Sequence, residues 1–156
     1  MSSPLHLGKY RVSGKPGTLE IYKQLKGIAF NEYHDLFSLC VFLGYKNQKK
    51  MTVRRQREQL FWSDTFSKRE YAAFYALIIN DSDNEDNADY ELLKDGEKML
   101  EFLQDYADGG LQFFLESDIM KKYVKEKDGN CLLDFTSSDH IQKQIMYYVY
   151  NMYQQL

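Results

Sequence analysis

Apolar side chains recur every three or four residues in several segments of the chain. This spacing places them on one face of an α-helix, so each segment predicts an amphipathic helix. The predicted helices comprise residues 18–26, 31–43, 68–80, 88–107 and 111–123, with a last helix from Thr136-Ser137-Ser138 to the C-terminus. The predicted fold class is therefore all-α, a single compact domain of about five to six helices with room for a minor short strand pair.

Capping residues support these boundaries. Thr18 and Asn31 are N-cap candidates, and Ser67 and Glu70 have the spacing of a capping box. Glycines stand where helices are expected to end, namely Gly27, Gly44 and the pair Gly109-Gly110. Because the segment 68–80 is apolar around most of its circumference, we expect it to form the central and most buried helix.

Two segments lack a helical pattern. Residues 1–15 are polar and basic, which predicts a flexible lead-in and leaves residues 16–156 as the single helical domain. Residues 45–64 show no clear period. A short strand near Met51–Val53 and a helix from Thr52 are both open interpretations of this stretch.

Composition favours a water-soluble globular protein. The 156 residues are 44% hydrophobic and 28% charged, with 15% aromatic residues and only two prolines. The N-terminus lacks the apolar core of a signal peptide, and no uncharged stretch approaches the roughly 18 residues that span a bilayer. Two isolated cysteines, Cys40 and Cys131, do not make a disulfide framework. We therefore expect a reduced, cytoplasmic protein that has no membrane partner.

The net charge of −3 conceals a strong division along the chain. Residues 1–70 carry 13 basic and 6 acidic side chains, or +7, whereas residues 71–156 carry 7 and 17, or −10. A basic run near the middle of the chain dominates the first part, and two basic residues follow it: Lys46, Lys49, Lys50, Arg54, Arg55, Arg57, Lys68 and Arg69. Such asymmetry indicates a basic face for an anionic partner.

The aromatic residues Tyr45, Phe61 and Trp62 accompany this basic run. Clustered cations bind phosphates, and neighbouring aromatic rings can stack on bases, so the run is a candidate nucleic-acid interface. Two alternatives use the same residues. They can form an ordinary solvated loop beside a buried tryptophan, or dock onto an acidic protein.

The last predicted helix contains more aromatic residues than a core-facing stripe requires. Ile141, Ile145 and Val149 already supply such a stripe. Three tyrosines fall on or beside its flank: Tyr147, Tyr150 and Tyr153. Tyrosine is enriched in protein interfaces, so these residues are candidates for contact with another copy of the chain or a larger subunit, with simple core packing as the alternative.

Catalytic and metal-binding patterns are weak. The acidic segment with Asp81, Asp83 and Glu85 lacks the glycine and the final glutamate of an EF-hand loop, which favours a solvated loop. His34 and Asp35 are adjacent, and side chains at adjacent helix positions diverge by about 100°, which favours surface or capping roles. The chain also lacks the glycine-rich nucleotide-binding motifs. We therefore predict no catalytic residues, no metal site and no cofactor.

Three stretches resemble a small bacterial family. They are TLEIYKQL, DLFSLCVFLGYKNQKK and DYADGGLQFF, and together they are similar to the fourth family of Dnd-system-associated proteins. The matching motifs are Tyr22–Leu25, Asp35–Tyr45 and Tyr106–Leu111. Asn47-Gln48 stands where the family pattern has a glycine turn.

The resemblance implies a bacterial anti-phage defence setting linked to DNA phosphorothioation, and it brings no catalytic residues. The predicted function is a non-enzymatic accessory subunit that binds DNA or a larger subunit of a defence complex. Two alternatives stand beside it. One is an accessory subunit of a defence complex built around an SMC-like ATPase, and the other is a small metal-dependent nuclease.

Overall fold

The computed structural model describes residues 9–81, 93–128, 130–135 and 138–154. Its helices are α1 (Thr18–Leu25), α2 (Tyr33–Lys46), α3 (Lys68–Asn80), α5 (Gly96–Leu115) and α6 (Ser138–Gln154). Its strands are β1 (Arg11–Gly14), β2 (Glu58–Trp62), β3 (Val124–Lys127) and β4 (Asn130–Leu133). Short 3-10 turns occupy Ser63–Thr65 and Lys121–Tyr123. The prediction of a mainly α-helical fold with minor strand pairs is confirmed.

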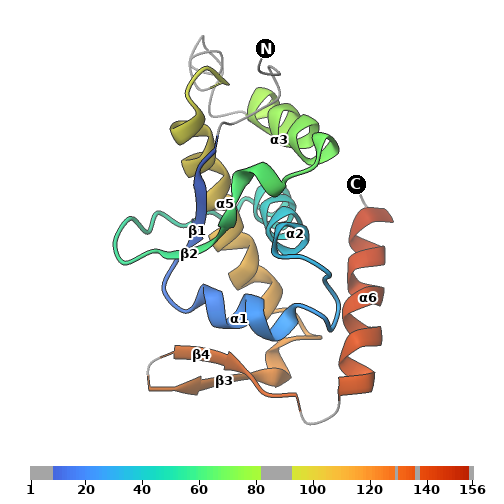
Figure 1. The fold of residues 1–156 in the computed structure, drawn as a ribbon. Coiled ribbons are helices and arrows are strands. Elements are labelled where there is room, and N and C mark those ends of the chain that lie inside the picture. The colour runs from blue at the N-terminus through green and yellow to red at the C-terminus, as the bar shows by residue number, and fades with distance from the viewer. Residues whose placement is uncertain (1–8, 82–92, 129, 136–137, 155–156) are drawn as a thin grey trace.

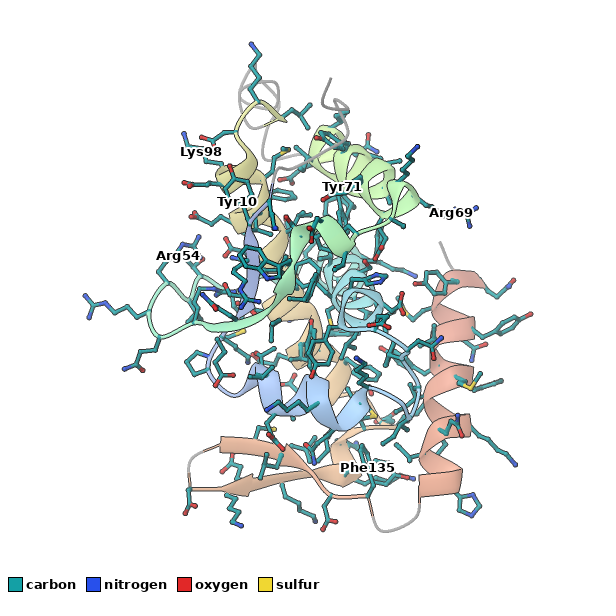
Figure 2. All side chains as sticks on the ribbon, viewed as in Figure 1. Tyr10, Arg54, Arg69, Tyr71, Lys98 and Phe135 are labelled. Carbon is teal, nitrogen blue, oxygen red and sulfur yellow. The ribbon has the colours of Figure 1, made fainter. Side chains whose placement is uncertain are left out.

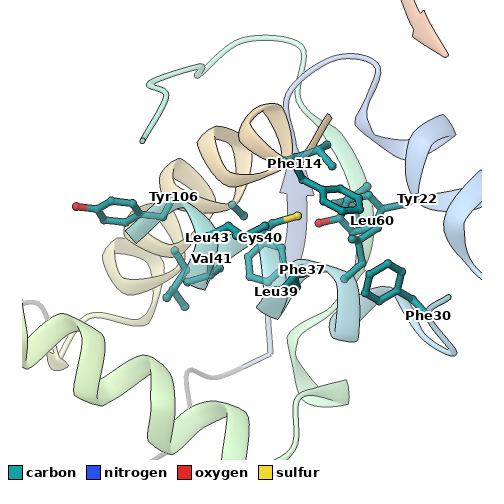
Figure 3. Close-up of a cluster of buried hydrophobic side chains, with 14 of the residues drawn as sticks. Tyr22, Phe30, Phe37, Leu39, Cys40, Val41, Leu43, Leu60, Tyr106 and Phe114 are labelled. Atoms are coloured by element: carbon teal, nitrogen blue, oxygen red, sulfur yellow. The ribbon is translucent and has the colours of Figure 1, made fainter. Parts of the chain in front are cut away.

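Helices α2 and α5 cross at the centre of the molecule and form most of the core (Figure 1). Eight residues of α2 are buried, including Phe37 and Cys40, which are fully inaccessible (Figure 3). The prediction that segment 68–80 is the central helix is wrong. It does form α3, with the predicted Ser67 capping box, but α3 lies at one end of the molecule and Ile79 is 56% exposed.

Gly27 follows the end of α1 with a positive φ of 87°, as predicted, but Gly44 and the pair Gly109-Gly110 lie inside α2 and α5. A Cβ atom on Gly110 would collide with the carbonyl oxygen of Cys40, and one on Gly44 would collide with that of Tyr106. Absence of a side chain therefore allows the two backbones to approach closely at the crossing. Because α5 continues to Leu115, the separate helix predicted over 111–123 does not form.

The expected lead-in contributes a strand to the fold. Residues 1–8 lie outside the described part, but β1 pairs antiparallel with β2, with Arg11 opposite Trp62. Val12 is fully buried, which explains why this short segment is held in place. Neither the strand near Met51–Val53 nor the helix from Thr52 forms. The strand of this region is β2, which begins further along the chain at Glu58.

A β-hairpin, β3–β4, follows α5 and the short 3-10 turn Lys121–Tyr123. Helix α6 then forms a column beside α2, and its C-terminal end points toward α3 (Figure 1). Ile141 and Ile145 anchor α6 because both are completely buried. Among the described residues, no helix has the length and apolar character needed to cross a membrane.

Candidate functional site

Arg57 belongs to the interior of the fold rather than to an exposed basic face. Its side chain is 13% exposed, and its Nη1 forms an ion pair with Asp108 Oδ2 at 2.9 Å. The guanidinium also donates to the side-chain and backbone oxygens of Ser13 and to the carbonyl oxygen of Val53. Asp108, Ser13 and Val53 thus engage the donors of Arg57 within the fold, which leaves this residue poorly placed to bind an anionic partner.

Arg54 also binds the acidic surface of α5. It makes ion pairs with Asp105 at 2.7 Å and with Glu101 at 2.9 Å, although its side chain remains 41% exposed. The charge division of the sequence is thus partly neutralised within the molecule. Besides Arg54, four cations of the run have exposed side chains and lie on or next to the segment between α2 and β2: Lys46, Lys49, Lys50 and Arg55.

The remaining basic residues of the candidate interface lie elsewhere. Lys68 and Arg69 are exposed on the first turn of α3. Figure 2 shows Arg69 and Arg54 projecting on opposite sides of the view. The predicted aromatic neighbours are also dispersed, since Phe61 is buried and Tyr45 packs against Tyr106 with ring centroids 5.5 Å apart. The eight cations do not form one continuous surface.

Trp62 has cationic neighbours that sequence spacing did not suggest. It is 41% exposed, with the guanidinium carbon of Arg11 4.4 Å and the Lys9 Nζ 5.3 Å from its ring centroid. Arg11 reaches the ring because β1 and β2 place the two residues opposite each other. Since the two residues are 51 positions apart in the chain, only the strand pairing brings them together.

The exposed face of α6 is apolar and almost free of charge. Tyr147, Tyr150 and Tyr153 are 66%, 61% and 52% exposed, and Met146 is 57% exposed. The segment 144–154 contains no charged side chain. The structure thus places all three predicted tyrosines outside the core, so the alternative of simple core packing is wrong.

A groove of about 680 Å³ separates α6 from α2 and α3. Its walls are mainly apolar, with Phe42 and Ala73 on one side and Met146, Val149, Tyr150 and Tyr153 on the other. Polar side chains from the first turns of α2 and α3 also line it. One groove therefore contains Arg69, Tyr150 and Tyr153. The sequence patterns assigned the arginine and the two tyrosines to separate sites.

The polar part of the groove includes a cluster of four side chains: His34, Asp35, Ser38 and Glu70. His34 Nδ1 lies 3.0 Å from Glu70 Oε1 and 3.5 Å from Asp35 Oδ1. Ser38 donates a hydrogen bond to the other oxygen of Glu70. The expectation that His34 and Asp35 diverge is wrong, because both side chains reach the same side of α2, where Glu70 of α3 also contacts the imidazole.

Two helix caps hold the carboxylates of this cluster in place. The backbone N–H of Ser67 donates to Glu70 Oε1 at 2.8 Å, and that of Glu32 donates to Asp35 Oδ2 at 3.2 Å. Both carboxylates thus occupy the third position of a capping box. Burial, followed by the negative charges of Asp35 and Glu70, raises the pKa of Tyr153 across the groove.

The chain matches one family model, that of DNA sulphur modification system-associated protein 4, over residues 17–145. The match includes the groove cluster and the basic segment, whereas β1 and the exposed face of α6 from Met146 onward lie outside it. Comparisons with curated proteins and with solved structures give no match. Since the model matches well over half of the chain, this protein belongs to the family of DNA sulphur modification system-associated protein 4.

Proposed function

We propose that the chain is a non-enzymatic accessory subunit of a DNA sulphur modification system and that it binds a larger protein subunit of that system. Membership of the family supports the setting. The exposed face of α6 is the observation that carries the binding role. It holds four of the six exposed large hydrophobic side chains among the described residues.

The composition of this face fits a protein partner better than a nucleic acid. Protein interfaces are enriched in tyrosine and methionine and depleted of charge at their centre, as is the segment 144–154. Binding to nucleic acid depends instead on cations that neutralise phosphates. Met146, Tyr150 and Tyr153 also line the groove, so a helix or loop of the partner has a concave site between α6 and the helices α2 and α3.

Co-expression with the other proteins of a DNA sulphur modification system tests this proposal. The informative variant combines Tyr147→Lys with Tyr150→Lys, because charge placed at the centre of an apolar interface is left uncompensated. Ile79→Lys is the matched control, since Ile79 is comparably exposed but belongs to α3. We expect the wild type and the control to co-purify with a larger subunit, and the double variant to lose at least about tenfold in affinity. Equal binding by a folded double variant contradicts the proposal.

A second candidate function is weak, salt-sensitive binding of DNA. The segment between α2 and β2 projects from the body of the molecule (Figure 1) and carries Lys49 and Arg55 with exposed side chains. Because Arg57 is engaged inside the fold and Arg54 is paired, fewer phosphate contacts are available than the sequence suggested. This contact would add to the binding of a protein partner without replacing it.

A further inference from the structure

We infer that His34, Asp35 and Glu70 form a binding site for one divalent transition-metal ion such as Zn²⁺, with an open coordination position toward the groove. This inference does not depend on what binds α6. The three side chains come from the first turns of α2 and α3. Each offers a ligand atom, and these atoms all lie within 4.8 Å of one another.

The spacing of the atoms fits a small metal ion. Zinc bonds to nitrogen and oxygen ligands are about 2.0–2.1 Å long, so two ligands of a tetrahedral ion are about 3.3 Å apart. His34 Nδ1 lies 3.0 Å from Glu70 Oε1 and 3.5 Å from Asp35 Oδ1, on either side of this value. An ion could therefore enter between these atoms with small side-chain movements and no rearrangement of the helices.

The carboxylates are oriented in advance by groups that would form a second coordination shell. Asp35 receives the N–H of Glu32, and Glu70 receives the N–H of Ser67 and the hydroxyl of Ser38. Such outer hydrogen bonds fix the direction of a ligand and increase metal affinity. The capping boxes thus do more than begin the helices, because they turn both carboxylates toward one imidazole nitrogen.

Access and charge also fit a cation. The side chains of His34 and Asp35 are 21% and 45% exposed, so an ion can reach them from the groove. Two carboxylates balance the charge of a divalent ion when the imidazole is neutral. The partial positive charges of two helix N-termini, about half a unit each, oppose binding but are smaller than this charge. An imidazole ligand favours zinc, copper, iron or nickel over magnesium.

The three ligands lie on segments that pack together only in the folded chain, and the fourth position would face the groove. Three protein ligands with one open position are the arrangement of zinc ions that bind a water molecule or a small ligand. Arg69 lines the same groove, which favours an anionic group as the exchangeable ligand. The site would therefore bind an ion that remains accessible rather than one enclosed for structure alone.

Zinc titration of the metal-free full-length chain, followed by calorimetry, tests the inference. We expect one ion per chain, with magnesium ineffective at the same concentration. Asp35→Asn and Glu70→Gln are informative because the amides keep the capping acceptors and lose the charged ligand. Each of these variants and His34→Gln should weaken binding at least about tenfold. His140→Gln and Cys131→Ser are matched controls, since they change other residues capable of binding zinc.

A crystal soaked with zinc provides a second measurement that does not depend on the folding of any variant. Anomalous scattering at the zinc edge should place the ion between α2 and α3, beside His34. An anomalous peak at another position, or no binding by the wild-type chain, overturns the inference. Loss of binding in the His140→Gln or Cys131→Ser control with retention in His34→Gln overturns it as well.

Discussion

Arg57 and Asp108 join three parts of the fold that are distant in the sequence. The guanidinium contacts β1 through Ser13, the preceding loop through Val53 and α5 through Asp108. Asp108 is only 3% exposed and also accepts the backbone N–H of Lys15. Removal of either partner would leave a buried charge without compensation, so this pair is a sensitive point of the structure.

The variant Arg57→Met should therefore lose about 3–5 kcal/mol of unfolding free energy, the usual penalty for breaking a buried ion pair from one side. Urea denaturation followed by circular dichroism measures this change. Arg55→Met is the matched control, because Arg55 is exposed two positions earlier and should change stability by less than about 0.5 kcal/mol. Equal stabilities of the two variants would show that the ion pair contributes little.

Asp108 also predicts a dependence of stability on pH. Burial raises the pKa of its carboxyl group above the ordinary value of 3.8, and Arg57 and Lys15 offset only part of this rise. The folded protein then holds the proton more tightly than the unfolded chain. The contribution of the protonated Asp108 carboxyl group to stability is complete below pH 3.8. It is lost as the pH rises through the pKa of this group in the folded state.

Comparison with Asp108→Asn isolates this contribution, because the amide does not titrate. We expect the unfolding free energy of the wild type to fall relative to that of the variant as the pH rises from below 3.8. Urea denaturation of both proteins across an acid-to-neutral series measures the difference. A wild type that gains stability relative to Asp108→Asn over this range would show that Arg57 outweighs burial.

At the scale of the elements, the crossing of α2 and α5 depends on glycines that helix propensity disfavours. Alanine favours the helical conformation over glycine by about 1 kcal/mol. If the site had space for a methyl group, Gly110→Ala would therefore stabilise α5. A methyl group at Gly110 would instead collide with the Cys40 carbonyl group of α2. We expect a net loss of about 1–3 kcal/mol in thermal or urea unfolding.

The exposed residue Gln112 provides the control for this experiment, because Gln112→Ala changes α5 two positions later without reaching α2. Its stability should stay within about 0.5 kcal/mol of the wild type. If Gly110→Ala is as stable as this control, the helices must separate easily, and the close crossing is not essential for folding.

The loop between α2 and β2 allows a test of DNA binding that leaves the fold intact. Lys49→Glu combined with Arg55→Glu removes two exposed cations and spares the Arg57–Asp108 pair. We expect the double variant to bind duplex DNA more weakly and with a smaller salt dependence, because each lost phosphate contact lowers the slope by about one. Fluorescence anisotropy between about 50 and 200 mM salt measures both effects.

Lys125→Glu with Lys127→Glu is the control for this comparison, since it makes the same change in net charge on the distant β3 strand. If both double variants weaken DNA binding equally, the effect comes from net charge and the loop is not a specific contact. Unchanged affinity in the loop variant would instead exclude these two cations from the interface.

For the whole molecule, the features that could be predicted from the sequence are those that depend on residues close together in the chain. Helical spacing identified α1, α2, α3 and α6, and the Ser67 capping box was assigned correctly. Contacts between distant residues were missed. Glycine at a helix crossing has the same local signature as glycine at a helix end, and only the position of α2 distinguishes Gly109-Gly110 from a stop signal.

Among the candidate site residues, too, those that depend on local spacing could be predicted, and those that depend on distant contacts could not. Periodicity placed Tyr147, Tyr150 and Tyr153 off the core-facing stripe, and they are exposed. By contrast, the burial of Arg57 depends on Asp108, 51 positions away, and the imidazole of His34 meets Glu70 only because α2 and α3 pack together. A run of like charges indicates potential binding, but it does not show which of its members the fold itself uses.

The pairing of β1 has a consequence for how the chain is made. A ribosome synthesises β1 before any of its partners, yet β2 follows about 45 residues later, and Ser13 and Lys15 bind Gln104 and Asp108, 91 and 93 positions away. The first strand can therefore complete its contacts only after most of α5 has left the exit tunnel. Nascent chains that end before Asp108 should be readily digested by protease, and protection should arise late, after α5 has emerged.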